Sequence, residues 1–387
     1  MPGGVTDVVK NRVLLTLWVL LACALCFLPL LTQAANRLVS GTGIPLWQLS
    51  YGAQAAVLLP AAALLAPVFT GQNRATYRWS YALSVLALCG LWGVIAWQSL
   101  LLAGAEESLT RVSLGGGAWL ATALCLLAGG DAVQRLTARA DLRIAFGVLL
   151  FLPGIVLLSS GALRGLSLLK EYANREDVFT LALFQHLGLL LGTLLISAAL
   201  GLPLGVAAAR HRRWRGMLFP LLNVIQTIPS IALFGLLIAP LAGLSRLWPW
   251  LGISGIGTTP ALIALVLYAL LPLVRSVVAG LEQVPGAVVD AARGVGMTRR
   301  QILLRVELPL ALPVVLSGMR IVAVQTVGMA VVAALIGAGG FGAIVFQGLL
   351  SSALDLVLLG VIPVIALAVV VDTLFKFWAS QWETERR

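Results

Sequence analysis

Residues 186–209 read HLGLLLGTLLISAALGLPLGVAAA and decide the class of fold. The stretch contains no Asp, Glu, Lys or Arg. As a helix rising 1.5 Å per residue, it is longer than the roughly 30 Å of hydrocarbon in a bilayer. A basic cluster, Arg210-His211-Arg212-Arg213, follows at once. The pattern predicts a membrane-spanning helix that ends at the cytoplasmic face.

Ten stretches of the chain, including this one, are apolar and long enough to cross a bilayer. They lie near residues 13–31, 53–69, 79–104, 114–130, 144–161, 186–209, 216–244, 259–279, 310–336 and 356–378. Of the 387 residues, 60% are hydrophobic and 11% are charged, whereas about one-quarter of a soluble protein is charged. This composition excludes a soluble enzyme, a disordered chain and a nucleic-acid-binding protein. We therefore expect an all-α fold, a polytopic membrane helix bundle of about ten transmembrane helices.

The basic residues predict the orientation of these spans. A net charge of +11 could indicate nucleic acid binding, but the 26 Lys and Arg residues form short clusters between apolar stretches. If the N-terminus is cytoplasmic, the inner loops and termini carry 18 of them and the outer loops carry six. Such an excess on one side is typical of cytoplasmic loops. We therefore expect both termini of the chain to be cytoplasmic.

The spans are expected to form two regions. Residues 1–165 contain the first five, joined by loops with few distinctive residues. Because the 19 residues of the first stretch exceed the core of a signal peptide, we expect it to remain as an uncleaved span. Residues 166–387 contain the other five spans, after a polar stretch at residues 169–177 on the expected outer side.

The loop between the eighth and ninth spans, residues 282–309, is the most informative part of the second region. Pro285 favours a helix that starts just after it, and Gly294 and Gly296 should end that helix. The helix is too short and too charged to cross the membrane. We expect it to lie at the cytoplasmic surface.

A second short helix is predicted within the same loop. Thr298 and Gln301 have the spacing of a capping box, and Pro309 is expected to end the helix. The residues alone leave two interpretations open. The two helices could form an interfacial pair that merely connects spans, or a docking element for a soluble partner.

A resemblance favours docking. The loop resembles the EAA loop of membrane-spanning subunits of bacterial ABC importers, whose pattern is Glu-Ala-Ala, three residues, Gly, nine residues, Ile-x-Leu-Pro. All spacings are kept, with Asp in place of Glu and Val in place of Ile. The matching residues are Asp290, Ala291, Ala292, Gly296, Val306, Leu308 and Pro309. The resemblance implies that the loop forms the coupling helix that enters a cleft of an ATP-hydrolysing subunit.

Two further segments resemble osmoprotectant permeases, which serve glycine betaine, choline or carnitine uptake. They are residues 226–233, QTIPSIAL, and residues 335–342, LIGAGGFG. The resemblance covers about residues 180–375, so the ABC-importer permease core is expected in the C-terminal half. With five extra spans before this core, the architecture is similar to the betaine-type permease of the Yeh system.

The resemblance implies a transport subunit of the bacterial inner membrane rather than an enzyme. Lys10, Lys170 and Lys376 are the only lysines and none follows a glycine, so we expect no P-loop and no cofactor or metal in this chain. The implied partners are two ATP-binding subunits, a second permease copy or paralogue, and an external substrate-binding protein. The implied cargo is a small osmolyte, glycine betaine or a related quaternary amine.

Five polar, charged or proline residues within predicted spans are candidates for the translocation pathway. They are Gln226, Thr227, Pro229, Ser230 and Arg320. The first four could instead form a packing kink in which Ser and Thr satisfy the backbone. Arg320 could face protein or water, or extend towards the cytoplasmic face.

Two other functions remain open from the residues. An ion-gradient-driven secondary transporter usually has carboxylates in mid-span, whereas here Asp355 and Asp372 lie towards the ends of the last span. A membrane assembly or regulatory subunit could keep the docking loop without transporting.

Overall fold

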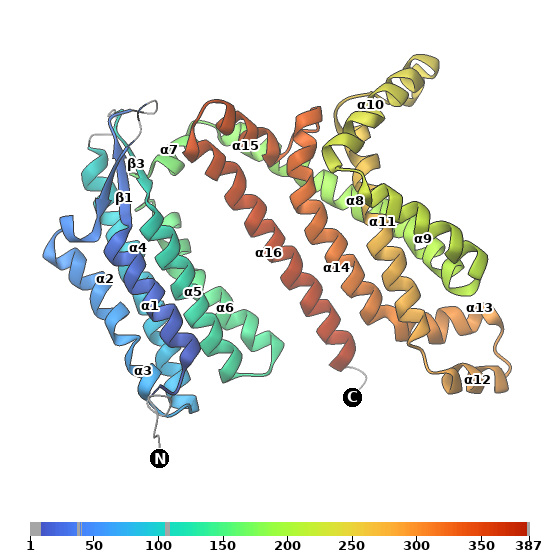
Figure 1. Cartoon of the computed structure of the whole chain (residues 1–387), viewed down its shortest axis with the longest axis horizontal. Helices are drawn as coiled ribbons and strands as arrows, with labels where there is room; N and C mark the ends of the chain where they lie inside the picture. Colours follow the sequence, from blue (N-terminus) through green and yellow to red (C-terminus); the bar gives the residue numbers. More distant parts are fainter. Residues whose placement is uncertain (1–8, 37–38, 40, 105–108, 385–387) are drawn as a thin grey trace. The chain divides into compact units, whose positions relative to one another are not determined.

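The computed structural model describes residues 9–36, 39, 41–104 and 109–384 (Figure 1). By their contacts these residues form two compact units, which divide between Asn174 and Arg175. Three basic residues used to predict the orientation, Arg37, Arg386 and Arg387, lie outside the described residues.

The first unit contains seven α-helices, three strands and a 3-10 turn. In chain order they are α1 (Arg12–Phe27), β1 (Pro29–Ala34), β2 (Thr42–Pro45), η2 (Leu46–Gln48), α2 (Tyr51–Ala63), α3 (Ala66–Phe69), α4 (Arg74–Ala103), β3 (Arg111–Leu114), α5 (Gly116–Leu136), α6 (Ala140–Ser159) and α7 (Ser167–Ala173).

The second unit is helical in all of its regular elements. In chain order they are α8 (Glu176–Arg210), α9 (Arg212–Thr227), α10 (Ser230–Leu247), η3 (Pro249–Leu251), α11 (Thr258–Glu282), α12 (Gly286–Gly294), α13 (Arg299–Ile302), η4 (Leu303–Glu307), α14 (Leu308–Ala333), η5 (Ala334–Ile336), α15 (Phe341–Leu350) and α16 (Leu354–Thr384).

Nine helical stretches among the described residues are long and apolar enough to cross a membrane. This confirms the predicted polytopic helix bundle. The helix α1 is apolar but has only 16 residues, about 24 Å at the α-helical rise, which is shorter than a typical hydrocarbon core.

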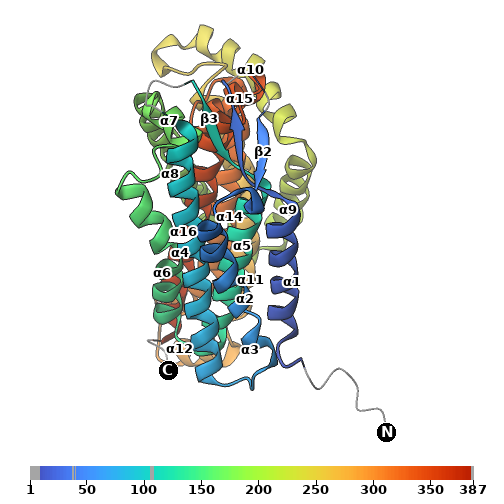
Figure 2. The ribbon, with the colours of Figure 1, turned by 90° about the vertical axis from the view of Figure 1, so that its left-hand side faces the viewer.

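A small antiparallel sheet in the first unit was not predicted. Its strand order is β2-β1-β3, and Figure 2 shows it at the end of the unit opposite α3. Leu166 forms a single bridge with Val112 of β3, and the Arg111 guanidinium lies 3.6 Å from the carboxylate of buried Glu171 in α7. These contacts attach α7 to the first unit.

Two of the predicted spans differ from the structure at a proline. The first was expected to run to residue 31, but α1 ends at Phe27 and Pro29 begins a strand. The seventh was expected to be one helix over 216–244, but it is broken between α9 and α10 at Ile228–Pro229. The residue before each proline has extended dihedral angles, which fits the steric restriction that proline imposes on its predecessor.

The second unit is organised around α11. In its most apolar window 67% of the residues are buried, against 17% for α10. The helices α8, α9, α10 and α14 all contact it. In Figure 1, α12 and α13 lie at one end of this unit and α10 and α15 lie at the other.

Candidate functional site

The 282–309 loop begins with α12, which starts immediately after Pro285 as predicted. Its end has the hydrogen bonds of a Schellman motif, in which the Met297 amide donates to the Ala292 carbonyl (3.2 Å) and the Gly296 amide to the Arg293 carbonyl (2.9 Å). Gly296 has φ +83°, a left-handed conformation that favours glycine. The predicted helix break at Gly296 is therefore confirmed.

The capping box is also confirmed. The Thr298 amide donates to the Gln301 side-chain oxygen (2.8 Å), and the Gln301 amide donates to the Thr298 hydroxyl (3.3 Å). The expectation that Pro309 ends the second helix is wrong. The chain widens into the π-helical turn η4 and continues as α14, whose first two residues are Leu308 and Pro309. Proline is tolerated there because the amides of a first helical turn lack intrahelical partners.

Most of α12 is exposed. Asp290 and Ala291 are exposed and Ala292 is its one buried residue, while Leu308 and Pro309 are half-buried at the start of α14. Asp290 pairs with Arg293 one turn later, at 2.9 Å. An isolated helix of nine residues is marginal in water, so α12 depends on its end turn, the Asp290–Arg293 pair and the burial of Ala292. An exposed helix held by its end turn is suited to contact with another molecule.

Two acidic residues of the 282–309 loop form ion pairs that the sequence reasoning missed. Glu282, the last residue of α11, pairs with Arg215 of α9. Glu307, at the end of η4, pairs with Arg210, the last residue of α8. The only signal in the sequence is the presence of acidic and basic residues in loops predicted to lie on the same side of the membrane.

The structure brings together four of the candidate pathway residues at the break between α9 and α10. Gln226 and Thr227 end α9, Pro229 precedes α10 and Ser230 is its first residue. The Gln226 side chain donates to the Tyr268 carbonyl at 2.9 Å.

Other polar contacts hold the same break. The Tyr268 hydroxyl donates to the Ile228 carbonyl, and the Thr227 hydroxyl donates to the Val224 carbonyl within α9. Asn223 lies one helical turn before Gln226 in α9, and its side chain accepts a hydrogen bond from the Arg275 guanidinium of α11 at 2.7 Å. The polar groups on this side of the break therefore fasten α9 to α11.

Arg320 lies on a different helix interface. Its Nε is 3.5 Å from a carboxylate oxygen of Asp372 on α16, and Lys376 contacts the other oxygen at 2.6 Å. These side chains are between about one-third and three-fifths exposed in the single chain. Ion pairing reduces the cost of placing charge inside a membrane span.

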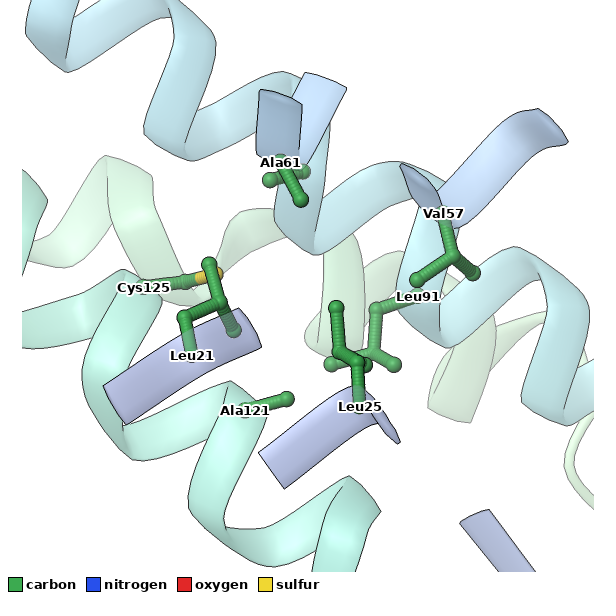
Figure 3. Close-up of a pocket in the computed structure, with 8 residues that line it drawn as sticks. Leu21, Leu25, Val57, Ala61, Leu91, Ala121 and Cys125 are labelled. Carbon is green, nitrogen blue, oxygen red and sulfur yellow. The ribbon is translucent and has the colours of Figure 1, made fainter. Parts of the chain in front are cut away.

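A cavity of about 10 Å³ lies where α1, α2, α4 and α5 of the first unit meet (Figure 3). Its lining side chains are apolar or, in one case, a thiol: Leu21, Leu25, Val57, Ala61, Ala87, Leu91, Ala121 and Cys125. The volume is at the lower limit for one water molecule, and a buried water also requires polar partners. The cavity is a packing gap and not a candidate binding site.

Two families match this chain in consecutive regions. Residues 10–169 match the N-terminal domain of the ABC transporter permease YehY. Residues 201–381 match the binding-protein-dependent transport system inner membrane component, a region that contains the whole 282–309 loop.

Several transport permeases are similar to part of this chain. The osmoprotectant import permease protein OsmW of Salmonella typhimurium strain LT2 is 40% identical over 191 residues, which cover 49% of this chain and 85% of that protein. OsmY of the same strain is 35% identical, over 60% of this chain and 94% of its own length. The carnitine transport permease protein OpuCB of Listeria monocytogenes is 36% identical, over 49% and 81%.

Proposed function

The chain belongs to the family of osmoprotectant ABC transporter permeases, and on that premise we propose that it is the membrane-spanning subunit of an ATP-driven importer of small osmolytes. Members of this family are transport components of the inner membrane that act with an ATP-binding subunit and a substrate-binding protein. The proposal for this chain extends to the direction of transport, the energy source and the class of cargo.

The exposed helix α12 is the observation that carries the proposal. Only Ala292 of its nine residues is buried. Two large apolar side chains are exposed to solvent: Val288 within α12 is 40% exposed, and Val295, directly after the helix, is 76% exposed. Apolar side chains at a water-facing surface favour a contact with another protein. We propose that the occupant is the ATP-binding subunit, which contacts α12 and its end turn at Asp290, Ala291 and Gly296. Ala292 would serve as the buried anchor of the helix, and Leu308 and Pro309 would support the loop at the start of α14.

The energy for transport would come from that partner, which binds the ATP and needs no cofactor from this chain. Two ATP-binding subunits would serve two permease copies, identical or paralogous, that enclose one pathway. We propose that the 282–309 loop and both termini of the chain face the cytoplasm. Closure of the ATP-binding subunits would favour one state of the bundle only if the docked loop has different contacts in the two states.

We propose glycine betaine or a related quaternary amine as the cargo. This class is supported by the relatives, which include an osmoprotectant import permease and a carnitine transport permease. A substrate-binding protein on the outer side would deliver the cargo and contribute most of the selectivity. Gln226, Thr227, Pro229 and Ser230, at the break between two helices, are the proposed pathway residues, together with Arg320.

An ion-gradient-driven transporter is less well supported. A carboxylate that binds and releases a coupling ion must be able to change its partner, whereas Asp372 is already paired with Arg320 and Lys376.

Reconstitution tests the function directly. The chain is placed in proteoliposomes with its ATP-binding subunit, and uptake of radiolabelled glycine betaine is measured with the substrate-binding protein outside and ATP inside. We expect uptake that requires both additions and stops when ATP is replaced by a non-hydrolysable analogue. Uptake that follows a proton or sodium gradient without ATP would reject the proposal, and so would the absence of uptake of any quaternary amine.

A further inference from the structure

The 282–309 loop is tied at both ends to the corner between α8 and α9. That corner consists of one residue, His211, between the last residue of α8, Arg210, and the first residue of α9. Arg210 pairs with Glu307 near the end of the loop, and Arg215 pairs with Glu282 at its beginning. We call these four residues the arginine clamp.

The two ion pairs have different surroundings. Glu307 is only 7% exposed, so loss of its arginine would leave a buried charge without this partner. Arg215 and Glu282 are both about half-exposed, and the Arg215 guanidinium also lies over the Phe219 ring, 5.9 Å from its centroid. The Arg210–Glu307 pair is therefore embedded at its glutamate, although the Arg210 side chain is 42% exposed, whereas the Arg215–Glu282 pair is exposed at both side chains.

The helices that meet at the clamp are closely packed. At Gly205 of α8, an added Cβ would lie 2.5 Å from the Val277 side chain of α11. At Gly280 of α11, it would lie 3.0 Å from the Ala311 carbonyl oxygen of α14. Small residues allow this close approach, and helices in such contact move together. A displacement of the clamp would therefore be passed to α8, α11 and α14.

We propose that the arginine clamp transmits displacement of the 282–309 loop to α8 and α9, so that Arg210, Arg215, Glu282 and Glu307 are positioning residues for coupling. This inference rests on the proposed function, because it concerns how the docked loop moves the bundle. The loop is joined covalently to α11 and α14, and α8 is joined to α11 by close packing. The clamp adds a direct tie from the two ends of the loop to the end of α8 and the first turn of α9.

The exposed pair gives the sharpest test. Arg215→Glu and Glu282→Arg are made singly and together, and the reconstituted complex is assayed for glycine betaine uptake and ATP hydrolysis in the same vesicles. Each single reversal places like charges opposite one another, and we expect uptake per ATP hydrolysed to fall by about two- to thirtyfold. The double reversal restores an ion pair and should restore the ratio. Arg213→Glu is the matched control, since Arg213 is an exposed arginine in the first turn of α9, close to the same corner.

The embedded pair is tested more conservatively. Glu307→Gln keeps the shape of the side chain, and combining it with Arg210→Gln removes both charges. Both single variants and the double variant lack the ion pair. We therefore expect all three to retain ATP hydrolysis and to show reduced uptake per ATP hydrolysed. A defect in folding would instead lower both activities and the yield of monodisperse complex, which size-exclusion chromatography measures.

The outcomes separate the clamp from the proposed function. If the wild-type complex shows no ATP-dependent uptake, the proposed function and the clamp are both rejected. If the wild-type complex is coupled and the single reversals keep the same uptake per ATP, the clamp is rejected and the function stands. Loss in the single reversals without rescue by the double reversal also rejects the clamp, because the ion pair would not be the cause.

Discussion

Replacing Gly296 by alanine would test whether the end turn of α12 holds the exposed helix in place. Gly296 has φ +83°, and no heavy atom lies within 4 Å of the position that an alanine Cβ would occupy. The substitution therefore adds no steric clash with the rest of the chain. Its effect should come only from forcing an L-residue into a left-handed backbone conformation.

The expected magnitude follows from that conformation. A left-handed backbone costs a residue with a Cβ about 1–2 kcal/mol relative to glycine. This free energy corresponds to a shift of about five- to thirtyfold in the equilibrium between the closed and open end turn. Asparagine tolerates the left-handed region better than alanine, so Gly296→Asn should have a smaller effect.

Hydrogen exchange of the purified permease in nanodiscs, without the ATP-binding subunit, measures this equilibrium. We expect the amide of Met297, which closes the turn onto the Ala292 carbonyl, to exchange about five to thirty times faster in Gly296→Ala.

Gly294→Ala is the matched control, because Gly294 is the last residue of α12, has open space around it and needs no left-handed backbone. It should leave the exchange unchanged or slow it. Equal exchange rates in the two alanine variants would refute the reasoning.

Three other predictions follow from the packing and the charges. Gly205→Ala should destabilise the second unit by about 1–3 kcal/mol, because the added Cβ would lie 2.5 Å from the Val277 side chain. Gly188→Ala is the control, since a Cβ at Gly188 would meet open space. Thermal unfolding in detergent compares the two variants, and equal midpoints would contradict the packing argument. Asp372→Asn should lower the free energy of unfolding by about 1–3 kcal/mol, because it removes the carboxylate partner of Arg320. Adding Arg320→Met to this variant should recover stability in the same assay. If stability is not recovered, the ion pair is not the cause. Val295→Cys in a cysteine-free background introduces a single exposed cysteine next to α12. It should react with a membrane-impermeant maleimide in inside-out vesicles and not in intact spheroplasts. The reverse pattern would place the 282–309 loop outside the cell.

The parts of the fold that depend on short-range chemistry could be predicted from the sequence. The helix start after Pro285, the left-handed turn at Gly296 and the capping box of Thr298 with Gln301 each depend on residues within a few positions of one another. The membrane-spanning helices could also be predicted, because the length of a continuous apolar stretch is likewise a local property of the sequence.

The breaks at Pro29 and Pro229 could not be predicted in this way. Pro203 and Pro272 lie within intact helices, so a proline alone does not indicate whether a span is interrupted. At Pro229, the carbonyl of the preceding residue accepts a hydrogen bond from Tyr268, about forty positions further along the chain. Whether the helix breaks depends on this neighbour in space.

The ion pairs of the arginine clamp have the same origin. Arg210 and Glu307 are 97 positions apart, and Arg215 and Glu282 are 67 positions apart. Their pairing requires the ends of α8 and α11 and the starts of α9 and α14 to lie at the same level. The helix α15, with ten residues after the left-handed Gly337, Gly339 and Gly340, was also missed because it is too short to stand out within an apolar region.

The interruption between α9 and α10 gives this transmembrane segment a joint. Among the described backbone hydrogen bonds, none connects the first turn of α10 to the last turn of α9. Tilting α10 relative to α9 thus requires rotation about the ψ bonds of Ile228 and Pro229, because the proline ring fixes φ, and it would strain the hydrogen bond from Tyr268 to the Ile228 carbonyl. Bending an intact helix would instead rupture its internal ladder. Because α9 is fastened to α11 and few residues of α10 are buried, α10 is the half of the segment that can change its angle while α9 stays in place.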